Sequence, residues 1–254
     1  MRLSRIKLQL ARNRHLYRWT LFSLNLLRFL LRRPHEPDFA AFAGFDERPG
    51  IFLDIGANIG QSALAFRIFN RRTPILSIEA NRLHETELRL VRRLLKRFDY
   101  LISAAGEQPG SATLHVPVFR GLPLTGEASL DAGAVRRPWW VQQTAGASAG
   151  EPIEVLEVPV TIRRLDDLRL EPAFVKIDVE GAEGQVLRGM AETIARHRPI
   201  FLIEDAGSHD EVSGLLLAHG YAPYEYLAGA KRLRAPVGDT ARNLFYLPRE
   251  AAPA

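Results

Sequence analysis

Four short apolar runs in the sequence each end at an acidic residue, and these acids are the first candidates for chemistry. They are Asp54, Glu79, Asp178 and Glu204. A single acid after a strand is usually a helix cap, but four at one edge of a sheet would face a common site. Carboxylates there can accept hydrogen bonds from hydroxyl groups, remove a proton or bind a metal ion. The sequence therefore predicts a polar ligand site at this edge.

The densest charged group is the stretch Val-Lys-Ile-Asp-Val-Glu-Gly-Ala-Glu, which contains Lys176, Asp178, Glu180 and Glu183. Neighbouring carboxylates favour retention of a proton by one of them, a state suited to proton transfer. We expect Asp178 or Glu180 to act as a general base. Lys176 points to the same side of its strand as Asp178 and would tune that carboxylate or orient a substrate. A divalent metal site and solvated residues at a helix start are the alternatives.

A glycine turn, Asp-Ile-Gly-Ala-Asn-Ile-Gly over residues 54–60, follows the first apolar run. Gly56 permits a sharp turn and close approach of a ligand, and Gly60 opens a helix whose amides can bind a polar group. A dinucleotide site needs Gly-x-Gly-x-x-Gly so that the pyrophosphate fits, but here Asn58 fills that space. The turn therefore favours a ligand without phosphates, such as S-adenosylmethionine (SAM), over a purely structural role.

Glu79 lies about 20–25 residues beyond the glycine turn, where an acid can accept hydrogen bonds from both ribose hydroxyls of a nucleoside. NAD sites and SAM sites share this feature. Glu79 therefore supports a nucleoside ligand without choosing between the two.

Apolar runs alternate with helical stretches through most of the chain. The expected strands are residues 51–55, 74–78, 100–104, 154–161, 173–177 and 200–203, and the expected helices are residues 60–70, 83–97 and 211–219 with another after Gly181. Strands that alternate with helices predict a parallel, doubly wound sheet. In such a sheet ligands lie beyond the carboxyl ends of the strands, which is where the four acids are expected.

Composition and charge narrow the functional classes. Hydrophobic residues make up 46% and charged residues 25% of the 254 residues, which is ordinary for a globular domain with a core. Cysteine is absent, which excludes disulfides and thiol nucleophiles. Residues 1–33 hold nine of the 34 Lys and Arg and no acid, leaving 25 basic against 29 acidic residues elsewhere. A nucleic-acid enzyme more often carries positive charge around its site, so we expect no nucleic-acid partner.

The first 45 residues are expected to form a basic helical extension and a linker. Residues 3–31 contain no Pro or Gly and repeat apolar residues at helical spacing. Asn25 and Arg28 interrupt the apolar stretch 19–31, which is too short and too polar to span a bilayer. The helix would pack on the domain or on the second subunit of a homodimer, or lie on an anionic membrane surface. We expect a cytoplasmic protein, with peripheral membrane contact as the alternative.

Residues 117–152 differ from the rest of the chain. They contain five glycines, the pair Trp139-Trp140 and a run of small residues over 144–150. Long loops within a compact domain are uncommon and often act as lids over a site. The segment is interpreted as an inserted lid or as a partly disordered excursion.

Three blocks of sequence resemble the FkbM family of SAM-dependent methyltransferases. They are Phe52–Gly60, Ser77–Asn81 and Phe174–Gly189, with shorter likenesses at residues 103–106, 110–111, 165–168 and 200–204. The resemblance covers about residues 50–247 in consistent order. The third block is the most specific because it contains Lys-Ile-Asp-Val-Glu-Gly-x-Glu. The first 45 residues and the 117–152 segment depart from the family, which leaves the substrate open.

The resemblance implies a Rossmann-like, doubly wound and mostly parallel seven-stranded sheet, carrying a methyltransferase domain over residues 46–250 after the N-terminal helical extension. It implies transfer of a methyl group from SAM to a hydroxyl of a small molecule or saccharide. The residues expected to bind SAM are Asp54, Gly56, Asn58, Gly60, Glu79, Ala104 and Asp178. The residues expected to be catalytic, without a metal ion, are Lys176, Asp178 and Glu180.

Two other functions compete with this interpretation. An NAD-dependent oxidoreductase fits Glu79 but not Asn58. A non-catalytic scaffold could keep the fold and attach to membranes through residues 3–31. His115 and His209 are weaker candidates for a base, since a lone histidine is more often structural.

Overall fold

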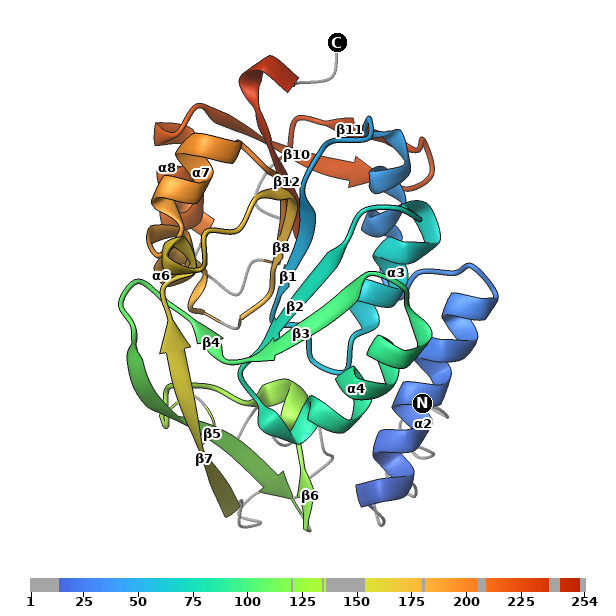
Figure 1. The fold of residues 1–254 in the computed structure, drawn as a ribbon, viewed down its shortest axis with the longest axis vertical. Coiled ribbons are helices and arrows are strands. Elements are labelled where there is room, and N and C mark those ends of the chain that lie inside the picture. Colours follow the sequence, from blue (N-terminus) through green and yellow to red (C-terminus); the bar gives the residue numbers. More distant parts are fainter. Residues whose placement is uncertain are drawn as a thin grey trace.

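The computed structural model describes residues 14–119, 121–133, 135, 154–179, 181–204, 209–237 and 243–251. Its centre is an eight-stranded sheet with strand order β11-β10-β12-β9-β8-β1-β2-β3 (Figure 1). The strands are β1 (Ile51–Ile55), β2 (Ile75–Glu79), β3 (Phe98–Ile102), β8 (Pro172–Ile177), β9 (Ile200–Glu204), β10 (Tyr221–Leu227), β11 (Arg232–Arg234) and β12 (Asn243–Pro248). The described part thus confirms the predicted doubly wound α/β architecture.

The order in which the strands are added to the sheet reverses at β1. β1 pairs in parallel with β2 on one side and with β8 on the other, and the order then runs outward to β3 and to β9. The carboxyl end of β1 is therefore the point where the two halves of the sheet diverge, which is where ligands bind in open α/β sheets.

The sheet has eight strands where seven were predicted. The additional strand is β11, a three-residue strand that pairs antiparallel with β10 at the edge. β12 is antiparallel to both β9 and β10. The sheet is therefore mixed at this end, because a helical connection leads from β9 to β10 and β12 then lies between them in the opposite direction.

Helices cover both faces of the sheet (Figure 1). On one face lie α2 (Arg14–Leu30), η1 (Pro37–Gly44), α3 (Gln61–Phe69), η2 (Arg82–His84) and α4 (Glu85–Leu94), and on the other lie η5 (Leu165–Leu168), α6 (Glu183–Arg188), α7 (Ala191–His197) and α8 (His209–Ala218). Strand alternation divides the core accordingly: Phe52 and Phe174 face the first group, whereas Leu53 and Val175 face the second.

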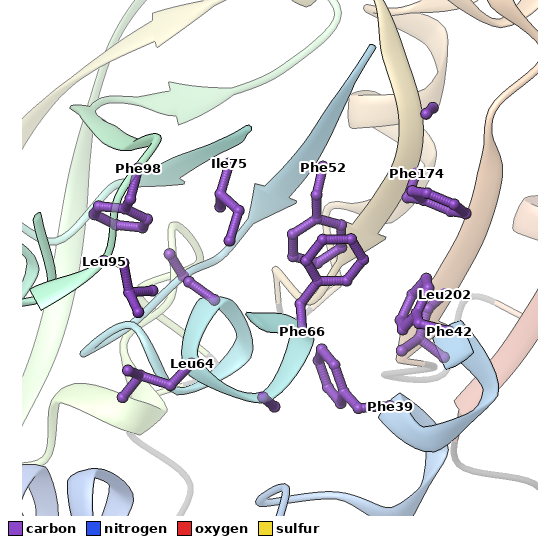
Figure 2. Close-up of a cluster of buried hydrophobic side chains, with 14 of the residues drawn as sticks. Phe39, Phe42, Phe52, Leu64, Phe66, Ile75, Leu95, Phe98, Phe174 and Leu202 are labelled. Carbon is purple, nitrogen blue, oxygen red and sulfur yellow. The ribbon is translucent and has the colours of Figure 1, made fainter. Parts of the chain in front are cut away.

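An aromatic cluster fills the first core, as Figure 2 shows. The rings of Phe52 and Phe66 are stacked with centroids 4.0 Å apart. Phe42 of η1 makes edge contacts with Phe66, Phe174 and Phe245 at 5.1, 5.6 and 5.6 Å. The sequence assigned residues up to 45 to an extension and linker, but η1 buries its aromatic side chains in this core.

A second, four-stranded sheet has the order β4-β7-β5-β6. Its strands are β4 (Ala104–Ala105), β5 (Gly110–Phe119), β6 (Leu122–Pro123) and β7 (Glu154–Arg163), and η3 (Thr125–Glu127) follows β6. β5 and β7 pair antiparallel from Gly110↔Ile162 to Val118↔Glu154. The predicted insertion therefore begins inside β5 and includes β6 and η3; its residues 136–152 lie outside the described ranges.

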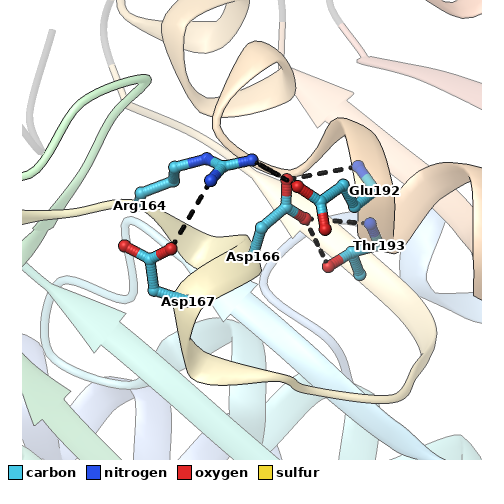
Figure 3. A network of polar contacts seen from close by, with 5 residues as sticks. All are labelled: Arg164, Asp166, Asp167, Glu192 and Thr193. Carbon is cyan, nitrogen blue, oxygen red and sulfur yellow. Dashed lines mark hydrogen bonds and ion pairs between the residues drawn. The ribbon is translucent and has the colours of Figure 1, made fainter.

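A polar network fixes η5 to the start of α7 (Figure 3). The Asp166 carboxylate accepts hydrogen bonds from the Thr193 amide (2.9 Å), the Thr193 hydroxyl (2.8 Å) and the Glu192 amide (3.2 Å). Arg164 pairs with Asp166, Asp167 and Glu192. Asp166 therefore satisfies the free amides of the α7 N-terminus. Residues 165–168, one of the shorter likenesses to the FkbM family, therefore have a structural role.

Candidate functional site

Strand register brings three polar side chains into one row beneath the carboxyl edge of the sheet. Asp54 of β1 is opposite Ser77 of β2 and Lys176 of β8. Residues opposite one another in register point to the same face of a sheet. The Ser77 hydroxyl donates a hydrogen bond to Asp54 Oδ2 at 2.8 Å. Because Asp54 is fully buried, its pKa is raised to about 6, although Lys176 and Ser77 act in the opposite direction.

Lys176 carries a buried charge that its surroundings compensate. Its ammonium is 2.6 Å from Asp178 Oδ2, and its exposure is 2%. Burial alone lowers the pKa of this lysine, but the Asp178 and Asp54 carboxylates outweigh burial and raise it above its ordinary value. Lys176 thus lies beside Asp178, as strand alternation predicted, and this ammonium group, not a neighbouring acid, is the described partner of Asp178.

Glu79 ends β2 and is held by backbone amides. Its two carboxylate oxygens accept hydrogen bonds from the Asn58 amide (2.6 Å) and the Asn81 amide (2.7 Å). Each carboxylate oxygen can accept a second hydrogen bond. Glu79 is therefore fixed in position and still able to accept hydrogen bonds from a ligand.

The glycine turn supplies one of these amides. Gly56, Asn58 and Gly60 all have positive φ angles, of 82°, 50° and 87°. A Cβ atom on Gly56 would collide with the carbonyl oxygen of Asp178, so the close approach of β1 to the end of β8 requires glycine. The left-handed conformation of Asn58, a residue that tolerates it well, directs its amide toward Glu79.

A cavity of about 260 Å³ lies where these elements meet. Five of the predicted site residues line it, namely Gly56, Asn58, Glu79, Ala104 and Asp178. Asp54 and Lys176 are buried outside its lining, and Gly60 caps α3. Glu204 also lines it. Glu180 lies outside the described residues.

The second sheet forms the opposite wall of the cavity. Leu114 of β5 and residues 125–126 and 128–130 line it together with the strand ends of the main sheet. The start of the predicted lid segment therefore lies at the cavity.

Several buried polar atoms at the cavity form no hydrogen bond with the described residues. His84 is 1% exposed, and both of its ring nitrogens lack a hydrogen bond. The Asn81 side-chain amide nitrogen and Gln61 Oε1 are in the same condition. Buried polar groups are normally hydrogen-bonded. Unsatisfied donors and acceptors around Glu79 fit a ligand with several polar atoms, as a nucleoside has.

Two lining residues come from the N-terminal segment, and the sequence did not indicate them. His35 and Glu36 follow α2 and reach the cavity near Asp178. Burial and the nearby Lys176 and Arg28 lower the His35 pKa to about 3, so its ring is neutral at pH 7. No local pattern distinguishes His35, because its place depends on how η1 packs.

Sequence reasoning also missed His84, although a signal was present. It lies five residues after Glu79, and its Nδ1 is 3.6 Å from Glu79 Oε1. The earlier histidine candidates lie elsewhere: His115 is 3.9 Å from Glu157 and is not among the lining residues, and the His209 side chain is outside the described set. Within the described residues, no group of three His, Asp or Glu side chains could hold a metal ion.

The fold and the site define a Rossmann-like α/β protein with a polar cavity at the carboxyl edge of its sheet. The family model of the methyltransferase FkbM domain matches residues 54–223. This match spans more than half of the chain, so the protein belongs to the FkbM methyltransferase family, and the resemblance seen in its sequence is confirmed.

Of two solved structures that match this chain, one has a similar fold. The methyltransferase FkbM from Methylobacillus flagellatus KT is 16% identical with a TM-score of 0.50, over 83% of this chain and 50% of that one. The chain therefore spans about half the length of that relative. The precorrin-6y C5,15-methyltransferase from Geobacter metallireducens GS-15 is 11% identical with a TM-score of 0.40, over 83% of each chain. A comparison with curated proteins gives no match.

Proposed function

We propose that this protein is a SAM-dependent O-methyltransferase that acts on a hydroxyl of a small molecule or saccharide. The observation that carries the proposal is a pair of carboxylates that line one cavity and are held in different ways. Glu79 is fixed by two backbone amides, and Asp178 is paired with a buried lysine. Family membership supports methyl transfer as the reaction.

The Glu79 side of the cavity suits a nucleoside. A carboxylate with free acceptor positions can bind two vicinal hydroxyls. The unsatisfied groups of Asn81 and His84 nearby are available to the remaining polar atoms of such a ligand. The Gly56–Gly60 turn then lies where the amino-acid end of SAM would bind. When bound, SAM supplies an electrophilic methyl group.

The Asp178 side suits an acceptor hydroxyl. An oxygen that gains a methyl group must lose its proton, and a carboxylate at the cavity wall can take it. Lys176 holds Asp178 in place through an ion pair of 2.6 Å. His35 and Glu36 add polar groups to the same wall, which supports a hydroxylated acceptor. Alignment of the two reactants supplies most of the remaining rate enhancement.

The test combines binding with product analysis. Calorimetric titration with SAM, S-adenosylhomocysteine and NAD should show binding of the first two and none of the third. Incubation with methyl-¹³C SAM and fractionated pools of small molecules and saccharides should give ¹³C resonances in the methyl-ether range. Binding of NAD alone would favour the oxidoreductase. Label on nitrogen or carbon would refute O-methylation while leaving methyl transfer intact.

A further inference from the structure

The exposed side of α2 is mostly apolar, with Thr20 and Ser23 among its residues, contrary to the usual arrangement of a surface helix. Five of the ten exposed large hydrophobic side chains in the described residues lie in this short region: Trp19, Leu24, Leu27, Leu30 and Leu31. Leu30 and Leu31 are 68% and 58% exposed, and Leu27 is 51% exposed. A surface helix normally turns such residues inward, so this apolar face needs a partner.

The helix is already fixed to the domain through its opposite side. Phe22 is buried in the first core, and Phe29 packs against it. Arg18 forms an ion pair with Glu87 of α4, with Nε 3.0 Å from Oε1. At 100° per residue, the exposed positions from Trp19 to Leu31 fall within about 140° of arc. α2 therefore lies along the surface of the domain (Figure 1). Its exposed apolar side chains form a stripe that faces outward.

The charge of the N-terminal sequence indicates the kind of partner. Residues 1–33 contain nine basic residues and no acid, and Arg32 and Arg33 are exposed immediately after the stripe. A twofold dimer through this face would bring two such segments together and place like charges side by side. An anionic lipid surface instead supplies opposite charge for the arginines and an apolar layer for the leucines.

We propose that α2 binds the surface of anionic membranes, with its apolar stripe (Trp19, Leu24, Leu27, Leu30 and Leu31) inserted at the boundary between headgroups and acyl chains. The helix lies in the plane of the membrane, since no described helix is long and apolar enough to cross one. Trp19 takes the interfacial position that tryptophan prefers. This binding does not depend on methyl transfer.

Vesicle sedimentation of the full-length protein tests the proposal. The protein should sediment with vesicles of phosphatidylcholine mixed with phosphatidylglycerol, much less with phosphatidylcholine alone, and less at high salt. The variant Leu27→Ser with Leu30→Ser should bind at least about tenfold more weakly, because two leucines lose their apolar contact. The matched control, Leu156→Ser with Leu217→Ser, removes two exposed leucines outside α2 and should bind like the unmodified protein.

A second pair of variants tests the contribution of Arg32 and Arg33 to vesicle binding. Arg32→Gln with Arg33→Gln should weaken binding to the anionic vesicles by roughly tenfold or more, since each basic residue near such a surface contributes about 1 kcal/mol. Arg196→Gln with Arg249→Gln, two exposed arginines away from α2, should leave it unchanged.

The fluorescence of Trp19 reports directly on insertion of the helix into the lipid surface. Tryptophan occurs three times, at 19, 139 and 140. With Trp139 and Trp140 replaced by phenylalanine, the emission of Trp19 should shift to shorter wavelength on binding, and brominated lipids should quench it. Vesicle binding without this shift, or equal binding by both leucine variants, overturns the proposal. A dimer in solution that dissociates in Leu27→Ser with Leu30→Ser, without vesicle binding, assigns the stripe to a second copy of the chain.

Discussion

The two sides of the cavity hold their carboxylates by opposite means. On the β2 side, Glu79 is fixed by uncharged backbone amides. On the β8 side, Asp178 is paired with Lys176, which in turn lies beside the fully buried Asp54. Amides fix a carboxylate without placing a compensating charge in the core. A buried lysine adds a charge whose removal would affect the surrounding fold.

We therefore expect the two sides of the cavity to have separate roles, with ligand binding at Glu79 and proton transfer at Asp178. A change on the Glu79 side should alter affinity for the nucleoside and little else. A change on the Asp178 side should alter turnover and, through Lys176, stability. Four substitutions test this division, beginning with the largest expected effect.

Asp178→Asn should reduce turnover by on the order of 10²–10⁴-fold, because the amide keeps the shape of the side chain but cannot accept a proton. SAM affinity measured by calorimetry should stay within a fewfold of the unmodified value. Glu180→Gln, made in parallel, tests the other predicted base. Asp167→Asn, an exposed acid on η5, is the control. Full activity of both the Asp178 and Glu180 variants would exclude a carboxylate base at these positions.

Lys176→Met should lower the free energy of unfolding by about 3–5 kcal/mol, because it leaves the Asp178 and Asp54 carboxylates without their compensating charge. Chemical denaturation measures this loss, and the exposed Lys231→Met serves as control. Combining Lys176→Met with Asp178→Asn should recover part of the stability, since one of the uncompensated charges is then absent. If the two losses simply add, the buried pair is not coupled as the geometry implies.

Asp54→Asn tests the buried acid through the pH dependence of the free energy of unfolding. Burial raises the pKa of Asp54 to about 6, so between its unfolded pKa and pH 6 the folded state binds more protons than the unfolded state. The free energy of unfolding of the natural protein therefore falls as pH rises through this window. Asparagine cannot titrate, and the stability difference should shift in favour of the variant by about 2 kcal/mol between pH 4 and pH 7.

Denaturation curves at several pH values measure that difference, in which the titrations shared by both proteins cancel. Asp99→Asn, an exposed acid on β3, should show no comparable shift. A difference that is constant with pH would mean that Asp54 is ionised throughout the range, with Lys176 fully compensating it.

Local patterns predicted the parts of this site that lie next to one another in sequence. The strand-to-acid transitions at Asp54, Glu79 and Asp178 follow from apolar periodicity, and the glycine turn from its spacing. The lysine beside Asp178 also followed, because Lys176 lies two residues earlier on the same face of the strand. The partners of Asp54 and Glu79 did not follow. Lys176 meets Asp54 because β8 pairs with β1 in a particular register, and register between distant segments is not encoded locally.

The residues that line the walls of the cavity were harder still to predict, because their positions depend on tertiary structure. β5 was not predicted, because its partner β7 follows a long intervening segment and only their pairing makes it a strand. His35 reaches the site because η1 buries Phe39 and Phe42 in the aromatic core. The sequence shows those phenylalanines but not what they pack against, so the contribution of the N-terminal segment became visible only in the folded chain.

Glu79→Ala is expected to have the smallest effect of the four and to be the most specific. It removes a carboxylate that would accept hydrogen bonds from the ligand, so SAM affinity should fall by about 1–3 kcal/mol, or roughly 5- to 150-fold. The alanine also leaves the Asn58 and Asn81 amides without their acceptor, which would loosen the glycine turn.

Glu79→Gln separates the loss of ligand contacts from the loosening of the turn, because its amide oxygen can still accept one of those hydrogen bonds. Calorimetry should therefore rank affinity as natural protein, Glu79→Gln, then Glu79→Ala, with turnover at saturating SAM changed much less than in Asp178→Asn. Glu157→Ala, an exposed acid of β7, provides the control. Unchanged affinity in Glu79→Ala would place the nucleoside elsewhere and end the division of the cavity into two sides.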